Sequence, residues 1–237
     1  MIDTLADRLD EAAVSHTALA PFGADVGLDV ATAYLVQEAL VARRQQRGET
    51  VVGLKLGLTS RAKMAQMGVD EVIWGRLTDA MRVTDGDTVS LADRIHPKVE
   101  PEVAFLVEGG AIAAVAPAIE LIDSRYRDFR FTLPEVIADN TSASGFVVGP
   151  WRPVPDGVDN LGVLLEVDGR IAQVGSTAAI LGDPRRALPE AARLAGKLRD
   201  GWVLLAGAAT AAVPLTPGAQ VRVTVEQLGT ASLRASA

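Results

Sequence analysis

The 237-residue sequence contains no cysteine and only two histidines, His16 and His96. Without thiolates the chain cannot form a disulfide, an iron–sulfur cluster, a thiolate zinc site or a catalytic thiol, and two imidazoles are too few for a His-rich zinc site. The sequence also lacks a GxxxxGK(S/T) phosphate loop, a complete GxGxxG after a strand and a GxSxG elbow, which disfavours nucleotide, dinucleotide and hydrolase-triad chemistry. The chemistry that remains is that of carboxylates, lysine and backbone groups.

Long apolar runs and runs of basic residues are missing as well. The apolar stretch from Trp202 to Leu215 contains Gly and Pro and is shorter than the roughly 18 residues of a membrane span. The N-terminal segment has acidic residues where a secretory signal would have basic ones. Lys and Arg total 23 against 30 acidic residues, a net charge of −7, and no basic run could follow a phosphate backbone. We therefore expect a soluble cytoplasmic protein with no nucleic-acid partner and no membrane partner.

Aromatic residues are scarce, at 4% of the chain, whereas apolar residues reach 49%, so the core must consist of aliphatic side chains and alanine. The first fifty residues have helical periodicity. The second helix, from about Val30 to Arg47, can be capped by Asp29 and stopped by Gly48. The three arginines in its last turns suit a solvated helix end beside the negative pole of the helix dipole.

From residue 50 onward, short apolar or alternating runs predict strands. VVGLKLGL, KVEPEVAFLV, VRVTVEQL and TASLRA are typical of strands, and Asp168-Gly169 is typical of a two-residue hairpin turn. Helices are expected at TSRAKMAQMG and at FTLPEVIADN, where Thr132 and Glu135 have capping-box spacing. A further helical stretch is expected from Asp183 to Gly201, with Pro189 as an interruption.

No internal repeat, low-complexity tract or linker divides the sequence. The helical region 1–50 and the β-rich region 51–237 therefore predict an α+β protein. We expect a single catalytic domain over residues 1–237, with its catalytic core in the β-rich part.

The segment VEPE places two carboxylates in an apolar strand. Alternation along a strand puts Glu100 and Glu102 on one face and Pro101 on the other. Crowded carboxylates in an apolar setting repel each other unless a positive charge lies between them, so a divalent cation is one explanation. A solvated strand face, whose glutamates meet Lys98 or an arginine, is the alternative. Because Pro101 cannot donate to a ladder, we expect an edge strand or a bulge here.

A third carboxylate in an apolar setting favours the cation. Glu120, in APAIELID, is flanked by Ile119 and Leu121. Three carboxylates without an imidazole suit a hard cation such as Mg²⁺ or Mn²⁺, which prefers oxygen ligands and retains waters that a substrate can replace.

Lys55 is the lone charge in VVGLKLGL. It could extend its ammonium to the surface from an edge strand. It could instead be a desolvated ammonium that balances an enolate or relays a proton, because burial lowers the pKa of a lysine. His96, four residues before Glu100, is expected to be structural.

Four blocks of the sequence stand out: GLKLGLTSRAKMAQMGVDEVIWGRL, HPKVEPEVAFLV, AIELIDSRYRDFRFTLPEVIADNTSASGFVVG and ATAAVPLTPG. Together they resemble the hydratase and decarboxylase branch of the fumarylacetoacetate hydrolase superfamily, over most of the chain from Val51 onward. The resemblance implies a mixed β-roll with peripheral helices. It also implies that Glu100, Glu102 and Glu120 are ligands of Mg²⁺ or Mn²⁺ and that Lys55 is the active-site lysine.

Within that branch, the IDSRY, DFRF and ATAAVP blocks look more like the decarboxylases than the hydratases. The activity implied is metal-dependent decarboxylation of a small 2-oxo acid, 2-oxohex-3-enedioate, in aromatic meta-cleavage catabolism. Arg125 of IDSRY is then a partner for the distal carboxylate, with a surface salt bridge as the alternative. The rival activity is hydration of 2-hydroxypenta-2,4-dienoate. The resemblance further implies a homo-oligomer and a complex with a paralogous hydratase.

The chain departs from the family pattern in its connections. A short segment, EGGAIAAVAP, separates Glu102 from Glu120, where the resemblance implies a longer connection with an extra helix. Ala206-Gly207-Ala208 stands where relatives show Thr-Gly-Gly. A further alternative is therefore a non-catalytic relative that kept the fold and serves as the assembly partner of a paralogous hydratase.

Overall fold

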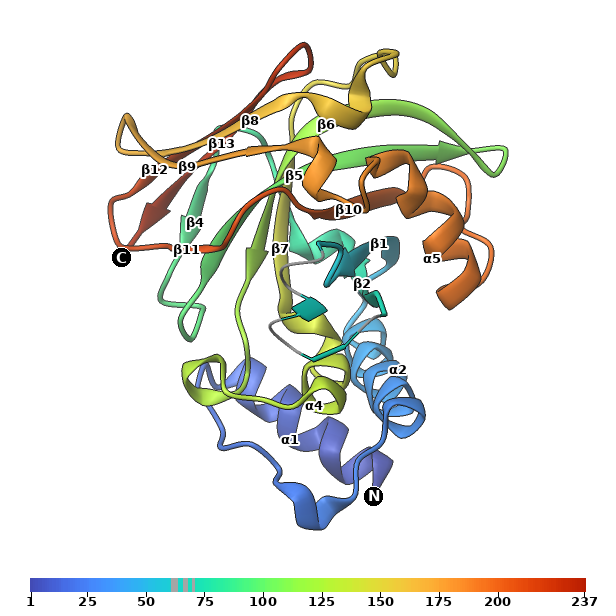
Figure 1. Ribbon diagram of the computed structural model, residues 1–237. Coiled ribbons are helices and arrows are strands. Elements are labelled where there is room, and N and C mark those ends of the chain that lie inside the picture. The colour runs from blue at the N-terminus through green and yellow to red at the C-terminus, as the bar shows by residue number, and fades with distance from the viewer. Residues whose placement is uncertain (61–63, 66–67, 70) are drawn as a thin grey trace.

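The computed structural model describes residues 1–60, 64, 65, 68, 69 and 71–237. Within these residues the chain forms two β-sheets that pack on each other, with helices beside them (Figure 1). Aliphatic side chains from both sheets, such as Val103, Val163 and Val223, fill the space between the sheets. The predicted α+β class is confirmed. The helix expected at TSRAKMAQMG includes residues that lie outside the described ranges.

The strand order of the first sheet is β2-β1-β10-β5-β6-β7-β3, with β11 paired to β5. Its strands are β1 (Val51–Gly57), β2 (Ile73–Thr78), β3 (Arg82–Val83), β5 (Lys98–Glu108), β6 (Ala111–Ile122), β7 (Ala143–Val148), β10 (Val203–Ala208) and β11 (Val213–Pro214). The strand order of the second sheet is β4-β13-β12-β8-β9. Its strands are β4 (Thr88–Ser90), β8 (Gly162–Val167), β9 (Arg170–Ser176), β12 (Gln220–Val225) and β13 (Gly229–Ser236). The hairpin predicted at Asp168-Gly169 joins β8 to β9, with φ of 52° and 72° at the two turn residues.

The first sheet is curled, and its two faces bury different sets of residues. The outer face, which includes Leu54 and Leu56 of β1, packs into the core between the sheets. The inner face holds a smaller apolar cluster with members such as Leu77, Ala104 and Phe146. Side chains of alternate residues on β1, β5 and β6 therefore point into the curl.

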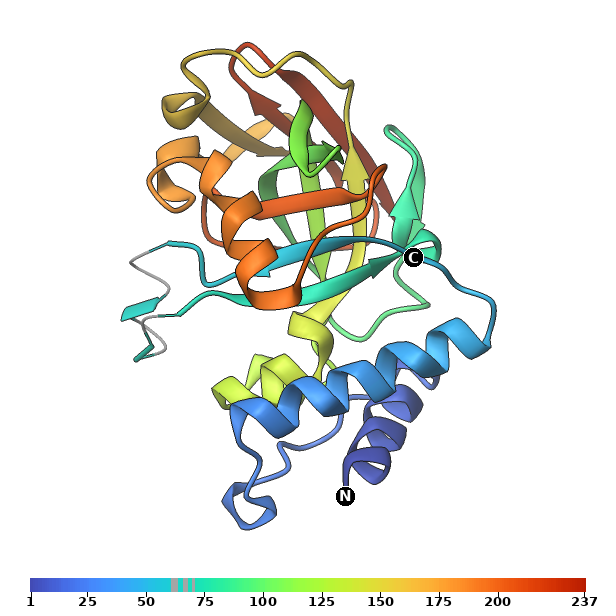
Figure 2. The same ribbon diagram turned by 90° about the vertical axis from the view of Figure 1, so that its right-hand side faces the viewer.

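Two long helices precede the first strand at one end of the sheets, where the first packs on the second and the second packs on α4 (Leu133–Ala138) (Figure 2). They are α1 (Ile2–Val14) and α2 (Val30–Gln46). Asp29 caps α2 as predicted, because its side chain accepts a 2.7 Å hydrogen bond from the Thr32 N–H. Among the described residues, no helix combines the length and hydrophobicity needed to cross a membrane.

The arginines at the end of α2 are not a simple solvated helix end. Arg43 lies 2.6 Å from Asp7, and Arg47 lies 2.7 Å from Asp10; both acids belong to α1. The prediction was wrong because the dipole argument considers one helix at a time. The ion pairs show that the acidic face of α1 and the basic end of α2 hold the two helices together.

The ends of the helices in the second half of the chain are determined by the residues at those ends. α4 begins at the predicted capping box, in which the Thr132 N–H donates 2.7 Å to Glu135. The expected interruption at Pro189 is absent, because Pro189 lies in the first turn of α5 (Ala187–Ala195), where its missing N–H is not needed. This helix also ends before Gly201, at Gly196, whose φ is 82°.

β5 and β6 form a long antiparallel hairpin. Gly109 and Gly110 close it, with φ of 59° and 76°, the positive values that a two-residue hairpin turn requires. The short connection between Glu102 and Glu120 is therefore a hairpin with no helix, and its register shifts once, between Leu106 and Val107.

Pro101 does not lie on a sheet edge, because β5 is paired on both sides. The ladder between β5 and β10 is interrupted between Leu205 and Ala208, next to Pro101. There the Ala209 N–H donates a 2.9 Å hydrogen bond to the Pro101 carbonyl. The expected edge was wrong, and the expected bulge is found in the neighbouring strand, where the ladder does not need an N–H from proline.

Candidate metal centre

Three glutamates converge on the inner face of the first sheet. Glu100 and Glu102 are alternate residues of β5, and Glu120 lies directly opposite Glu100 on β6. One carboxylate oxygen from each residue lies within 4.8 Å of the other two. The exposed fractions are 6%, 1% and 0%, so the alternative of a solvated strand face is wrong. We refer to these three residues as the carboxylate cluster.

A backbone N–H from β10 fixes one member of the cluster. Gly207 donates a 2.9 Å hydrogen bond to Oε2 of Glu102. Gly207 has a φ of 118°, and a Cβ at this position would lie 2.6 Å from Cγ2 of Thr59. Glycine is therefore required for the approach of β10 to Glu102, whereas its neighbours Ala206 and Ala208 are buried apolar residues.

Lys55 reaches the cluster from the other side of the curl. Its Nζ lies 3.0 Å from Oε1 of Glu120 and donates a 3.0 Å hydrogen bond to the carbonyl oxygen of Thr141. β1 and β6 are separated by β10 and β5 in the strand order, about 14 Å in a flat sheet, so this contact depends on the curl. Lys55 is only 4% exposed, so the alternative in which it extends to the surface is wrong.

Burial and the neighbouring charges shift the pKa values of the glutamates and of Lys55. Burial, together with the charge on Glu120, raises the pKa of Glu102 well above its ordinary value. Burial also raises the pKa of Glu120, against the opposing effect of Lys55. Burial by itself would lower the pKa of Lys55, as the sequence suggested, but the three glutamates outweigh it and the pKa of Lys55 is raised. The raised pKa favours the ammonium form of Lys55 in the metal-free site, where it is a charge partner of Glu120.

The donor set fits a hard divalent cation. Oε1 of Glu102 and Oε2 of Glu120 are buried and accept no hydrogen bond from any described residue. Oxygens on opposite sides of one Mg²⁺ or Ca²⁺ ion lie about 4 to 5 Å apart, which matches the spread of the cluster. Among the described residues, the buried carboxylates of Glu102 and Glu120 share the ammonium of Lys55, and a divalent ion would supply further positive charge between them.

Arg125 follows β6 and is also buried, at 7% exposure. Its Nε, Nη1 and Nη2 all donate to nearby acceptors: a carboxylate oxygen of Asp139, the Ala143 carbonyl and the Asp139 carbonyl. A salt bridge is therefore present, but in the interior and not at the surface. The contact between Arg125 and a distal substrate carboxylate stays a prediction.

Backbone groups near the cluster were missed by the sequence analysis. The carbonyl of Thr141 and the N–H of Gly207 are backbone groups, so no side-chain type in the sequence points to them. Only a run of buried polar residues could have indicated the Thr141 carbonyl. Such a run exists: Asp139, Asn140 and Thr141 are all buried in succession. The ring centroid of His96 lies 4.8 Å from that of Phe129, and the expected structural role of His96 stays a prediction.

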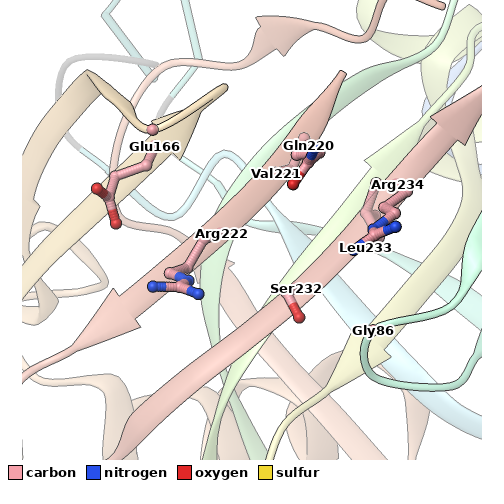
Figure 3. Close-up of a pocket in the computed structure, with 9 residues that line it drawn as sticks. Gly86, Glu166, Gln220, Val221, Arg222, Ser232, Leu233 and Arg234 are labelled. Carbon is pink, nitrogen blue, oxygen red and sulfur yellow. The ribbon is translucent and has the colours of Figure 1, made fainter. Parts of the chain in front are cut away.

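A hollow elsewhere on the molecule does not involve the predicted residues. Figure 3 shows this hollow on the second sheet, about 300 Å³ in volume, with Glu166 on β8, Arg222 on β12 and Arg234 on β13 among its lining residues. Arg222 and Arg234 are exposed, and Glu166 lies directly opposite Arg222 in the ladder. The buried carboxylates of the first sheet therefore remain the candidate site.

The comparisons with known proteins identify the family to which this fold belongs. Residues 83–234 match the family model described as the fumarylacetoacetate (FAA) hydrolase C-terminal domain. The chain belongs to the fumarylacetoacetate hydrolase family. It is 52% identical to a 4-oxalocrotonate decarboxylase of Pseudomonas sp., over 98% of this chain and 96% of that protein. It is 37% identical to a 2-keto-4-pentenoate hydratase of Burkholderia vietnamiensis, over 87% of each chain.

A solved structure shows the same arrangement of the chain. The 4-oxalocrotonate decarboxylase of Pseudomonas putida G7, complexed with magnesium and adipate, superposes with a TM-score of 0.92. The match covers 99% of this chain and 97% of that one, at 35% sequence identity. The similarity thus extends over the helical N-terminal region as well as the sheets.

Proposed function

We propose that this protein is a metal-dependent decarboxylase that converts 2-oxohex-3-enedioate to 2-hydroxypenta-2,4-dienoate and CO₂. The observation that carries the proposal is the buried carboxylate cluster beside the Lys55 ammonium, in which Oε1 of Glu102 and Oε2 of Glu120 accept no hydrogen bond from a described residue. The 52% identity to a 4-oxalocrotonate decarboxylase supports this reaction. The related structure holds magnesium and adipate, and adipate is a six-carbon dicarboxylate like the proposed substrate.

Glu100, Glu102 and Glu120 are the residues that would hold the cation. Mg²⁺ or Mn²⁺ would there supply Lewis-acid polarisation of the 2-oxo group and a countercharge for the 1-carboxylate. The chain's own contribution is to keep these oxygens in place: Gly207 fixes Glu102, and Lys55 fixes Glu120. Because the three carboxylates are buried, they have few water molecules to displace when substrate binds.

Lys55 has a distinct role in the bond changes. The C5–C6 bond of the substrate breaks, CO₂ leaves, and the electron pair moves through C4 and C3 so that negative charge accumulates on the 2-oxygen. A proton then completes the 2-hydroxyl group. An ammonium held in a low-dielectric interior stabilises such developing charge more strongly than one in water, so we assign this role to Lys55.

Hydration of 2-hydroxypenta-2,4-dienoate is the second candidate. It is favoured by the 37% identity to a 2-keto-4-pentenoate hydratase, and it would use the same cluster. The non-catalytic alternative has less support, because the short connection still places Glu120 opposite Glu100 and Gly207 still binds Glu102.

Product analysis separates these candidates. The purified protein with Mg²⁺ is given each substrate, and CO₂ release is compared with formation of 4-hydroxy-2-oxopentanoate. We expect one CO₂ per 2-oxohex-3-enedioate consumed, and none with Mg²⁺ omitted and a chelator present. Water addition alone would assign the hydratase reaction, and no turnover of either substrate would favour the assembly partner.

The remaining features of the protein are proposed on the same basis. We propose that residues 1–237 form one catalytic domain, because Ile73 of β2 and Tyr126 share an apolar cluster with Leu5 and Val36 of the helices. A homo-oligomer, a complex with a paralogous hydratase and a cytoplasmic location stay predictions. Light scattering of the purified protein, alone and mixed with such a hydratase, tests the first two.

A further inference from the structure

The carbonyl that holds Lys55 belongs to a turn with an unusual backbone. Thr141 is the middle residue of η4 (Asn140–Ser142), whose three residues have φ of 49°, 52° and 59°. None of them is glycine, and a side chain disfavours this left-handed region at each position. Three such residues in succession persist only when their surroundings enforce the conformation.

One side of the turn is enforced by a buried ion pair. Asp139, the residue before the turn, is fully buried, and Arg125 donates to both its carboxylate and its backbone carbonyl. The same carboxylate accepts a 3.1 Å hydrogen bond from the Arg125 N–H and a 3.3 Å bond from the Ser124 hydroxyl. On the far side of the turn, the Arg125 guanidinium donates 3.2 Å to the Ala143 carbonyl. One arginine therefore bridges the residues that flank the turn.

The other side of the turn is held by β2. The Asn140 side chain accepts a 2.7 Å hydrogen bond from the Arg76 N–H and donates 2.9 Å to the Arg76 carbonyl. Gly75, which pairs with Lys55 in the ladder, leaves the space that the turn occupies. A Cβ at position 75 would lie 2.6 Å from the Asn140 carbonyl oxygen and closer still to the Thr141 hydroxyl.

We propose that Arg125 and Asp139 are positioning residues for Lys55. They hold the Asn140–Ser142 turn in its left-handed conformation. This turn places the Thr141 carbonyl where it accepts a hydrogen bond from the Lys55 ammonium and orients it toward Glu120. Arg125 then acts through the turn and does not bind substrate. The inference rests on the proposed function in one respect, since it takes Lys55 to act on the bound substrate.

The first test replaces one residue of the Arg125–Asp139 ion pair at a time and measures the effects on kcat and KM separately. Arg125→Lys retains the positive charge but cannot reach all three acceptors, and Asp139→Asn removes the charge at nearly constant shape. We expect kcat to fall about 100-fold in each, because small misplacements of a catalytic group have effects of this size, with KM and Mn²⁺ affinity within about threefold. The matched control is Arg94→Lys, since Arg94 is also partly buried but donates to Ser144, outside the turn.

A second variant moves the turn without touching the ion pair. Gly75→Ala places a methyl group against the turn, and we expect a similar loss of kcat with unchanged KM. Gly157→Ala is its control, because the added methyl group there meets no atom within 4 Å. A rise in KM with kcat retained in Arg125→Lys would overturn the inference in favour of a substrate contact. A kcat equal to that of the two controls would overturn it as well.

Crystal structures of the variants test whether Arg125 positions Lys55, independently of which reaction the protein catalyses. We expect the distance between Lys55 Nζ and the Thr141 carbonyl to exceed 3.5 Å in Arg125→Lys and in Gly75→Ala. An unchanged distance of 3.0 Å in both would refute the positioning role, whatever the activity. Failure of the wild-type protein to release CO₂ would instead refute the proposed decarboxylation, and the distance would still decide the role of Arg125.

Discussion

At the residue scale, Glu102 is a buried member of the carboxylate cluster that is held by a backbone group. It is held by the Gly207 N–H, is 1% exposed, and has its pKa raised by burial and by Glu120. Replacing Glu102 therefore has two separate effects: it removes a metal ligand, which lowers metal affinity, and it relieves the repulsion between carboxylates, which stabilises the metal-free protein.

We expect Glu102→Gln to lower Mn²⁺ affinity at least about 100-fold and to abolish decarboxylation. The metal-free variant should nevertheless unfold at a higher temperature than the metal-free wild type, because one crowded carboxylate has become neutral. Calorimetric titration and thermal unfolding measure the two effects. Glu108→Gln, at the exposed end of the same strand, should change neither, and wild-type affinity in Glu102→Gln would remove this residue from the metal site.

Lys55 differs from the glutamates because it meets charge that develops during the reaction. We expect Lys55→Met to lower kcat about 100- to 1,000-fold, as for loss of one stabilising donor, and to change KM less than about threefold. Steady-state kinetics with saturating Mn²⁺ measure both parameters, and Lys197→Met serves as an exposed control. A selective rise in KM would show that Lys55 binds a substrate carboxylate instead.

At the scale of elements, the sequence predicted those parts that local chemistry determines. The Asp29 cap, the Thr132–Glu135 capping box and the hairpin turn at Asp168-Gly169 each depend on residues within a few positions of one another. Elements that depend on distant partners were predicted poorly. An edge strand or a bulge was expected at Pro101 because proline cannot donate, and the interrupted ladder lies in the neighbouring strand β10, which the local sequence could not indicate.

The candidate site also contains residues that the sequence could indicate and groups that it could not. Glu100, Glu102 and Lys55 could be selected from the sequence because charged residues in apolar strands are conspicuous. Their surroundings could not, because the Gly207 N–H and the Thr141 carbonyl are backbone groups that any residue possesses. The left-handed turn of η4 was equally inaccessible, since it is enforced by Arg125 and β2 and not by glycine.

At the scale of the whole molecule, the metal should couple stability to pH. Because the pKa values of Glu102 and Glu120 are raised, these two groups bind more protons in the metal-free folded protein than in the unfolded chain at pH values between their ordinary and raised pKa. Their contribution to stability is therefore present at acid pH and is lost as the pH rises through the raised values. A cation must displace these protons, so its own stabilising effect increases with pH.

We expect Mn²⁺ at about 100 times its dissociation constant at pH 8 to raise the free energy of unfolding by about 2.7 kcal/mol, and the same Mn²⁺ concentration at pH 5 to have a clearly smaller effect. Denaturant unfolding with and without Mn²⁺ at the two pH values measures the difference. Glu102→Gln should lose most of the effect at both values. An equal stabilisation of the wild type at pH 5 and pH 8 would show that the buried glutamates are not the groups that bind the ion.

The β5–β6 hairpin also has a consequence for the order of folding. Its two-residue turn makes it one of the most local pairings in the molecule, yet closing it brings Glu100 directly against Glu120. The neutralising Lys55 arrives on β1, which pairs with neither strand of the hairpin. Like charges directly across a ladder oppose its closure. At neutral pH the repulsion between Glu100 and Glu120 therefore opposes this end of the hairpin, and packing of β1 brings the Lys55 ammonium to Glu120 and offsets it.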